Sequence, residues 1–237
     1  MRTRGFFVSG TDTGVGKTLV ACALVRAMRR RGLDVGVMKP IETGVGAEGP
    51  LDALALRDAA EAREPLEEIC PQTFALPAAP TVAAASEGRA VELEAIRDAF
   101  ARLRGRHEWL VAEGAGGLLV PAARDLSMAD LCREFQLPLL IVGRAALGTI
   151  NHTLLTLEAA EARSLPVAGV VISHCGGRLS EADSANLEAL RGALGATLMG
   201  EIPPLRDGQL PDEHSIDVGA LLERAGPGLD RKRTRRN

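Results

Sequence analysis

The chain has 237 residues, of which 46% are hydrophobic and 25% are charged, and its formal net charge is −3. This balance is ordinary for a folded α/β domain, and the small negative charge provides no general attraction to nucleic acid or to an anionic membrane. Four well-separated cysteines without a C-x-x-C pair argue against a zinc site or a redox pair. Because no apolar run is long enough for a secretory leader or a membrane span, we expect a cytoplasmic protein.

Short apolar runs alternate with longer helical patterns along the chain. In chain order the sequence predicts a strand at 5–9, a helix at 16–31, a strand at 35–38, helices at 52–63 and 91–104, a strand at 109–112, a helix at 126–135, a strand at 137–142, a helix at 149–163, a strand at 167–173, a helix at 180–194 and a strand at 197–199. The stretch 74–89, rich in alanine and proline, is interpreted as a surface excursion.

This alternation predicts the fold class. We expect an α/β fold with a doubly wound, mostly parallel sheet and helices on both faces, in three layers. Right-handed crossovers would place a site at the carboxyl ends of the strands. The predicted organisation is one domain over residues 1–224, followed by a disordered basic tail at 225–237. An RNA-binding tail is the alternative to a solvated one.

The segment GTDTGVGKT at 10–18 carries the strongest functional pattern, because it follows a predicted strand and opens a predicted helix. Its glycines allow several backbone N–H groups to face one anion, and the helix N-terminus adds further donors. Lys17 would neutralise phosphate charge, and the hydroxyl of Thr18 can ligate Mg²⁺. The first glycine stands one residue early, since Thr11 occupies the usual glycine position. The alternative is a glycine-rich turn without a ligand.

Four further polar residues fall near strand ends or helix starts, where they could join such a site. Glu113 follows the strand 109–112 and precedes a Gly-rich turn, and Asp52 begins a helix, so both can supply carboxylate oxygens to Mg²⁺. The alternative for Asp52 is a helix N-cap. Lys39 follows the strand 35–38 and would point into the same crevice, with Thr43 close behind it. The alternative for Lys39 is a surface lysine with a buried stem.

Together these segments resemble the dethiobiotin synthetase family over roughly residues 5–205. The likeness rests on 10–18, KPIETG at 39–44, DALAL at 52–56, EGAGG at 113–117, LGTINH at 147–152 and GEIP at 200–203. It implies a fold like that of P-loop nucleoside triphosphatases. It also implies a reaction in which 7,8-diaminononanoate and CO₂ form a carbamate, ATP phosphorylates the carbamate, and the second amine closes the cyclic urea of dethiobiotin.

The resemblance also implies roles for individual residues. Nucleotide binding falls to Asp12, Thr13, Gly14, Val15, Gly16, Lys17, Thr18, Glu113, Gly116, Ser173, Ile202 and Pro203. Catalysis falls to Thr13, Lys17 and Lys39, Mg²⁺ binding to Thr18, Asp52 and Glu113, and substrate binding to Lys39, Thr43, Thr149, Ile150 and Asn151. The implied partners are the small substrates and a second copy of the chain, which completes the site across a homodimer interface. Neither nucleic acid nor membrane is expected as a partner.

Two positions depart from the family pattern. Gly14 stands where some members carry Glu, so we expect a different recognition of the substrate amines. Ser173 and His174 stand where an Asn often faces adenine, which leaves nucleoside triphosphates other than ATP open as substrates. We expect His174 to be a polar residue at a strand end and not a catalyst.

Two other functions are compatible with the phosphate loop. An amide ligase of the cobyrinic acid a,c-diamide synthase type would need a glutaminase domain, for which 237 residues leave no room. A partitioning ATPase, which acts as an interaction switch, would carry an extra lysine early in the loop, where this chain has Thr11, Asp12 and Thr13. The sequence therefore favours the ligase.

Overall fold

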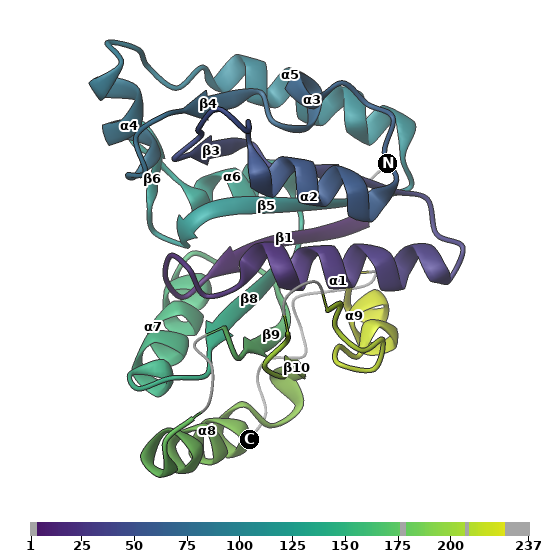
Figure 1. The fold of residues 1–237 in the computed structure, drawn as a ribbon, viewed down its shortest axis with the longest axis vertical. Helices are drawn as coiled ribbons and strands as arrows, with labels where there is room; N and C mark the ends of the chain where they lie inside the picture. Colours follow the sequence, from purple (N-terminus) through teal and green to yellow (C-terminus); the bar gives the residue numbers. More distant parts are fainter. Residues whose placement is uncertain (1–3, 176–178, 207–208, 226–237) are drawn as a thin grey trace.

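The sheet at the centre of the molecule has six strands in the order β10-β9-β8-β1-β5-β2, all of them parallel (Figure 1). The computed structural model describes residues 4–175, 179–206 and 209–225. The strands are β1 (Arg4–Gly10), β2 (Val35–Met38), β5 (Trp109–Gly117), β8 (Leu139–Arg144), β9 (Val167–Ser173) and β10 (Leu198–Ile202). With β1 in the middle and later strands added on both sides of it, the sheet is doubly wound, as predicted.

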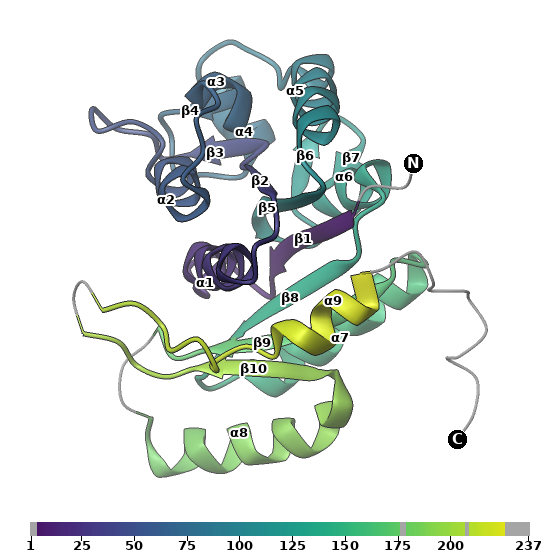
Figure 2. The same ribbon diagram turned by 90° about the vertical axis from the view of Figure 1, so that its right-hand side faces the viewer.

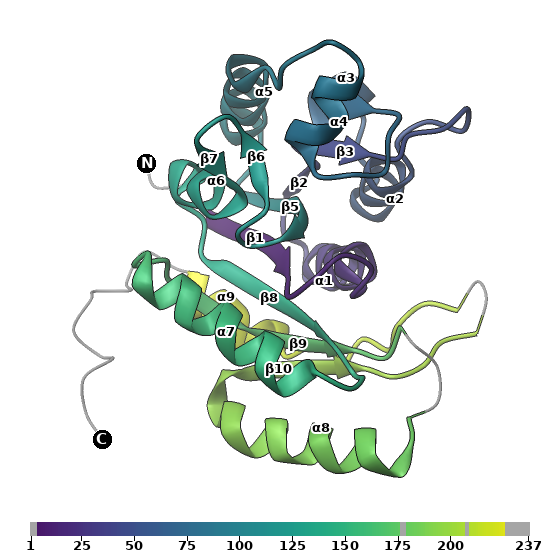
Figure 3. The same cartoon turned by 90° about the vertical axis from the view of Figure 1, so that its left-hand side faces the viewer.

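Helices cover both faces of this sheet, because its strands are apolar on both sides. Phe6 and Val8 of β1 join one buried cluster, whereas Phe7 between them joins the other. The first cluster includes side chains of α1 (Lys17–Arg30), α2 (Leu51–Ala60) and α9 (Val218–Ala225). The second includes side chains of α5 (Leu93–Arg106), α6 (Met128–Phe135), α7 (Thr149–Ala162) and α8 (Glu181–Leu194). Figures 2 and 3 show α1 and α2 on one side of the sheet and α5 and α6 on the other.

Several short elements lie between the predicted ones. They are the parallel pair β3 (Ile41–Thr43) and β4 (Gln72–Phe74), the antiparallel pair β6 (Pro121–Ala123) and β7 (Leu126–Ser127), α3 (Leu66–Ile69), α4 (Pro80–Ser86) and a 3₁₀ turn at Gly195–Thr197. The stretch 74–89 is thus more than a surface excursion. It contains α4, which begins at Pro80, because a proline at the first helical position favours the start of a helix. Ala83 and Ala84 of this helix are buried.

Several predicted boundaries are wrong, and two of them for a common reason, which is packing by neighbouring elements. The helix predicted at 126–135 begins only at Met128, because residues 126–127 form β7. The expected Gly-rich turn after Glu113 is a continuation of β5 to Gly117, because β1 pairs with it as far as that residue. Ala225, expected to begin the disordered tail, is the last residue of α9 and is buried in the first cluster. Residues 226–237, which contain the basic run, lie outside the described residues. None of the described helices is long and apolar enough to cross a membrane.

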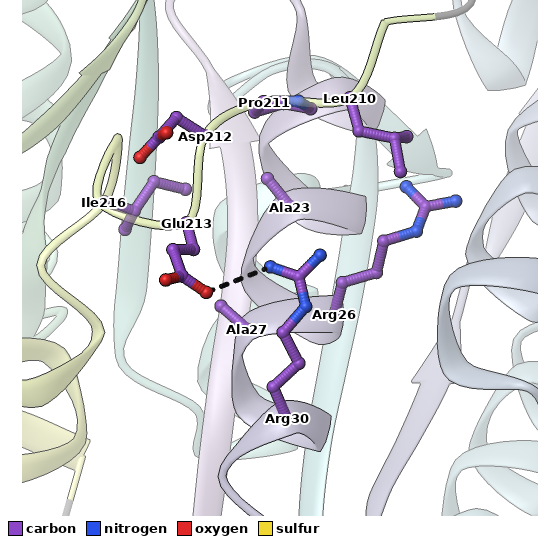
Figure 4. Close-up of a pocket in the computed structure, with 9 residues that line it drawn as sticks. All are labelled: Ala23, Arg26, Ala27, Arg30, Leu210, Pro211, Asp212, Glu213 and Ile216. Carbon is purple, nitrogen blue, oxygen red and sulfur yellow. Dashed lines mark ion pairs between the residues drawn. The ribbon is translucent and has the colours of Figure 1, made fainter.

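The segment that leads into α9 packs along α1 (Figure 4). Arg30 of α1 and Glu213 form an ion pair with 3.6 Å between the nitrogen and the oxygen. The backbone N–H of Glu201 donates to the carbonyl of Ser215 at 2.9 Å, which attaches this segment to β10. The depression between the segment and α1 holds only about 10 Å³, roughly one water molecule, so it is packing and not a ligand site.

Candidate functional site

The loop between β1 and α1 has the conformation that an anion cradle requires. A side chain on Gly10 would come within 2.6 Å of the carbonyl oxygen of Asp12, so only glycine fits the bend. Gly16 has a left-handed φ of 90°, and a Cβ there would meet the hydroxyl of Ser173 at 2.5 Å. No side chain caps the N-terminus of α1. Its first N–H groups therefore face the loop, as in a phosphate-binding site.

A cavity of about 340 Å³ opens in front of this loop, at the carboxyl ends of β1, β2 and β5. Its walls are Thr13, Gly14, Gly16, Lys17, Thr18, Lys39, Ile41, Glu42, Thr43, Asp52, Glu113, Ala115, Gly116 and Cys175. Ten of these residues are among those predicted from the sequence. Residues more than 100 positions apart thus meet at one edge of the sheet, as the parallel topology requires.

Lys39 is the centre of the polar network in this cavity. Its ammonium nitrogen lies 2.7 Å from Oδ2 of Asp52 and 2.5 Å from Oε1 of Glu113. The hydroxyl of Thr18 donates to the same Glu113 oxygen at 2.9 Å. Lys39 is 2% exposed and Glu113 is fully buried. The alternative of a surface lysine is therefore wrong for Lys39, because two carboxylates hold its charge inside the protein.

Burial and neighbouring charges shift the pKa values of these groups in different directions. Burial by itself would lower the pKa of Lys39, but the carboxylates of Glu113 and Asp52 together raise it above its ordinary value. Burial, together with the nearby charge of Lys39, lowers the pKa of Lys17. Burial would raise the pKa of Asp52, but Lys39 outweighs it and lowers that pKa. The network thus favours a charged Asp52 and a protonated Lys39.

Glu42 positions Asp52, and it is a residue that the sequence analysis did not single out. Its two carboxylate oxygens accept hydrogen bonds from the backbone N–H groups of Asp52 at 2.9 Å and of Ala53 at 3.0 Å. The N-cap residue of α2 is Pro50, which has no side-chain donor or acceptor. The N-cap alternative for Asp52 is therefore wrong: a carboxylate from β3 caps the helix and leaves the Asp52 side chain free to reach Lys39.

Other residues missed by the sequence analysis are apolar or small. Ile41 and Ala115 line the cavity through their positions beside Lys39 and Gly116. Cys175 lies across from the loop, and its thiol donates to the carbonyl of Gly14 at 3.2 Å. Glu42 could have been found, because it stands inside the quoted segment 39–44. Nothing in the local sequence marks Cys175, which reaches the site only because β9 ends next to β8.

Several predicted nucleotide-binding residues lie outside the cavity walls. Val15 and Ile202 are fully buried in the apolar core, so only their backbone could face a ligand. Ser173 is fully buried beneath Gly16. Asp12 accepts a hydrogen bond from the N–H of Thr13 at 2.7 Å and shapes the loop. Pro203 is exposed just after β10.

The predicted substrate residues on α7 form a separate region, which we call the α7 edge: residues 147–155. Its helix begins after Gly148, at φ 88°. The hydroxyls of Thr149 and Thr153 are buried without a hydrogen-bond partner among the described residues. Leu147 and Leu155 are 72% and 54% exposed, and Asn151 is exposed as well. This region does not line the cavity described above.

The oxygen donors of the cavity suit a hard divalent cation. Thr18, Asp52 and Glu113 provide a hydroxyl and two carboxylates, and one carboxylate oxygen of Glu113 is buried without a partner among the described residues. In the part of the chain that the structure describes, no three His, Cys, Asp or Glu side chains gather as a metal site. Water and phosphate oxygens would therefore complete the shell of an ion such as Mg²⁺, which commonly keeps such ligands.

The fold and the loop define the chain as a P-loop nucleoside triphosphatase-like protein. The AAA domain family matches residues 4–211. Solved structures with the same fold include the MinC:MinD cell division complex of Aquifex aeolicus (TM-score 0.54, 14% identity, 94% of each chain) and a ParA family ATPase of Chlorobium tepidum (TM-score 0.52, 13% identity, 94% of this chain and 98% of that one). At such identities the likeness concerns the fold alone.

Closer relatives place the chain more narrowly. It is 56% identical over 173 residues to the ATP-dependent dethiobiotin synthetase BioD of Anaeromyxobacter dehalogenans, covering 73% of this chain and 78% of the relative. It is 37% identical over 234 residues to the protein of the same name from Bacillus licheniformis, covering 96% of this chain and 100% of the relative. The chain belongs to the ATP-dependent dethiobiotin synthetase family.

Proposed function

We propose that this chain is a carbon–nitrogen ligase that makes dethiobiotin from 7,8-diaminononanoate, CO₂ and a nucleoside triphosphate. The observation that carries the proposal is the joining of two kinds of group in one cavity. The phosphate loop with Lys17 and the group formed by Lys39 with two carboxylates line the same cavity, and Thr18 and Lys39 contact the same Glu113 oxygen. Such a cavity can hold a triphosphate and an anionic acceptor side by side, which is what transfer of a phosphoryl group requires.

Each residue would have a distinct task in this reaction. The loop N–H groups, Thr13 and Lys17 would bind and orient the phosphates, and Thr18, Asp52 and Glu113 would hold Mg²⁺. When bound, the cation supplies neutralisation of phosphate charge. Lys39, with Thr43 beside it, would hold the carbamate of the substrate next to the γ-phosphoryl group. Ring closure is then intramolecular, so fixing both amines in place can contribute on the order of 7–11 kcal/mol to lowering the barrier.

The adenine end of the nucleotide would lie near β9 and β10, where Ser173, Ile202 and Pro203 are found. The structure gives no Asn at the end of β9, since His174 follows Ser173 and contacts Glu201. Because an amide that can pair with adenine is lacking at this position, we propose that the protein accepts other nucleoside triphosphates in addition to ATP.

A second copy of the chain would complete the substrate site at the α7 edge. Leu147, Leu154 and Leu155 are exposed there, with 38% for Leu154 as the smallest exposed fraction. Exposed leucines that cluster beside an unpartnered hydroxyl such as that of Thr149 are typical of a surface that a partner covers. We propose a homodimer in which Thr149, Ile150 and Asn151 bind the substrate carboxylate near the N-terminus of α7.

The decisive experiment is a coupled phosphate-release assay with 7,8-diaminononanoate and bicarbonate, run with each nucleoside triphosphate in turn. We expect phosphate release that depends on the diamine, together with a product of the mass of dethiobiotin. Release at the same rate without the diamine would instead favour a nucleotide switch of the partitioning type, whose fold this chain shares. No release with any nucleotide would contradict both.

A further inference from the structure

Lys39 contacts the same two carboxylates that would bind a divalent cation in the proposed function. Its ammonium contacts Oδ2 of Asp52 at 2.7 Å and Oε1 of Glu113 at 2.5 Å. The Glu113 oxygen is also the one that accepts the hydroxyl of Thr18. The ammonium group therefore contacts two of the three proposed metal-binding side chains. The third, Thr18, donates a hydrogen bond to the same Glu113 oxygen as Lys39 does.

An ammonium group and a divalent cation cannot contact the same carboxylate oxygens without competing for them. Oxygen ligands lie about 2.1 Å from Mg²⁺, so an ion bound to Oε1 of Glu113 would lie no more than about 4.6 Å from an ammonium 2.5 Å from that atom, where the two positive charges repel each other. Glu113 is fully buried, so little solvent screens this repulsion. Binding of a divalent cation therefore favours movement of the Lys39 ammonium away from the two carboxylates.

We propose that Lys39 is the resident counter-ion of the cation site and that a divalent cation displaces it into the cavity, where it becomes available to the anionic substrate. This inference rests on the proposed function and adds to it the order in which the cation and the substrate bind. Cation binding comes first and creates the free ammonium that recognises the carbamate. By thermodynamic reciprocity, an acidic substrate held by Lys39 strengthens cation binding to the same degree.

The charges of the cavity support this order. Three carboxylates, those of Glu42, Asp52 and Glu113, line the cavity together with only two ammonium groups, those of Lys17 and Lys39. A divalent cation adds two positive charges and frees Lys39 from its ion pairs. The cavity thus becomes more attractive to phosphate and carbamate once the cation is bound.

The choice of residue fits the same idea. The chain has 25 arginines and only three lysines, and two of those three, Lys17 and Lys39, line the cavity. Arginine binds carboxylates through a planar fork that is difficult to displace, whereas lysine is a point charge on a flexible stem. A displaceable counter-ion needs the second kind of side chain.

Competition predicts an unusual effect of removing the charge. In Lys39→Met, which keeps the length of the side chain, the free protein should bind Mn²⁺ at least tenfold more tightly than the wild type, measured without nucleotide by electron paramagnetic resonance. Lys17→Met is the matched control, because its ammonium contacts the carbonyl of Asp12 and neither carboxylate. We expect a much smaller gain there. Unchanged or weaker Mn²⁺ binding in Lys39→Met would overturn the proposal.

A second measurement uses the wild type and does not depend on the stability of a variant. With only three lysines, reductive methylation followed by mass spectrometry reports each amine separately. Lys39, which is 2% exposed, should react slowly in the free protein and several-fold faster with saturating Mg²⁺, relative to Lys232 in the same sample. Equally slow reaction of Lys39 with and without Mg²⁺ would contradict displacement. Diamine-dependent phosphate release by an untreated portion of the same preparation would leave the proposed function standing, so the two failures are distinguishable.

Discussion

The cavity at the phosphate loop and the α7 edge differ in how completely a single chain provides partners for their polar side chains. In the cavity, Lys39 pairs with the carboxylates of Asp52 and of the buried Glu113, although one Glu113 oxygen has no partner among the described residues. At the α7 edge, the hydroxyls of Thr149 and Thr153 have no partner among the described residues, and leucines face solvent. Since buried polar groups and clustered leucines are costly when left alone, the second region has more to gain from a partner than the first, and the proposed homodimer would provide one.

The largest expected effect tests the cavity alone. Lys17→Met should lower kcat by about 10³-fold or more, because a fixed positive charge at the phosphates is lost in a site with little water. Circular dichroism and sedimentation should remain those of the wild type, since Lys17 lines the cavity and not the α7 edge. Turnover within tenfold of the wild type would contradict the assignment of the loop.

Lys39→Met should have the next largest effect, which distinguishes chemistry from nucleotide binding. We expect kcat to fall by about 10²-fold, with a much smaller change in the Kd of the nucleotide, because the proposed contact of Lys39 is with the reacting groups. Steady-state kinetics combined with calorimetric nucleotide titration would measure both. If nucleotide affinity falls as much as kcat does, Lys39 is a nucleotide-binding residue and not a catalytic one.

A charge introduced at the α7 edge should affect dimer formation without affecting nucleotide binding in the cavity. Leu155→Asp should raise the dimer dissociation constant by about tenfold or more, because an aspartate cannot be buried in an apolar interface without a large desolvation cost. Analytical ultracentrifugation would measure it, and nucleotide binding should be unchanged. Leu210→Asp is the matched control, since Leu210 is 52% exposed against 54% for Leu155 and lies beside α1. Equal behaviour of the two variants would remove the argument for this interface.

The smallest effect concerns the edge of the sheet at β10. Burial would raise the pKa of Glu201, but hydrogen bonds from Arg191 and His174 outweigh it and lower that pKa. Because the folded pKa is lowered, the stabilisation is present above about pH 4.5 and is lost as the pH falls through the folded value. Glu201→Gln should therefore cost about 1 kcal/mol of unfolding free energy at pH 7 and less near pH 3, as measured by urea unfolding.

Glu188→Gln is the control for that measurement. Glu188 contacts the same arginine at 2.8 Å but is 74% exposed, so solvent screens its charge. We expect no measurable pH-dependent loss in this variant. The same pH dependence in both variants would assign the effect to Arg191 in general and not to its pair with Glu201.

Much of the fold and the site followed from local sequence patterns. Alternation of short apolar runs with helical periods predicted the six strands of the sheet, and the loop at 10–18 was identified because its glycines serve a backbone shape that no other residue allows. These features depend on neighbours in the sequence. Steric limits and hydrophobic periodicity therefore decide them before the chain is folded.

The remaining features depend on residues far apart in the chain, which only the tertiary structure brings together. Glu42 caps α2, a role for which Asp52 was the alternative candidate, β5 extends to Gly117 because β1 pairs with it, and Cys175 reaches the cavity from the end of β9. The pairing of Lys39 with both carboxylates is the clearest case. The sequence placed each charge at the end or start of an element, but only the packing of β2, β5 and α2 brought both carboxylates within 2.7 Å of the Lys39 ammonium. Such contacts depend on distance in space, which spacing along a chain does not specify.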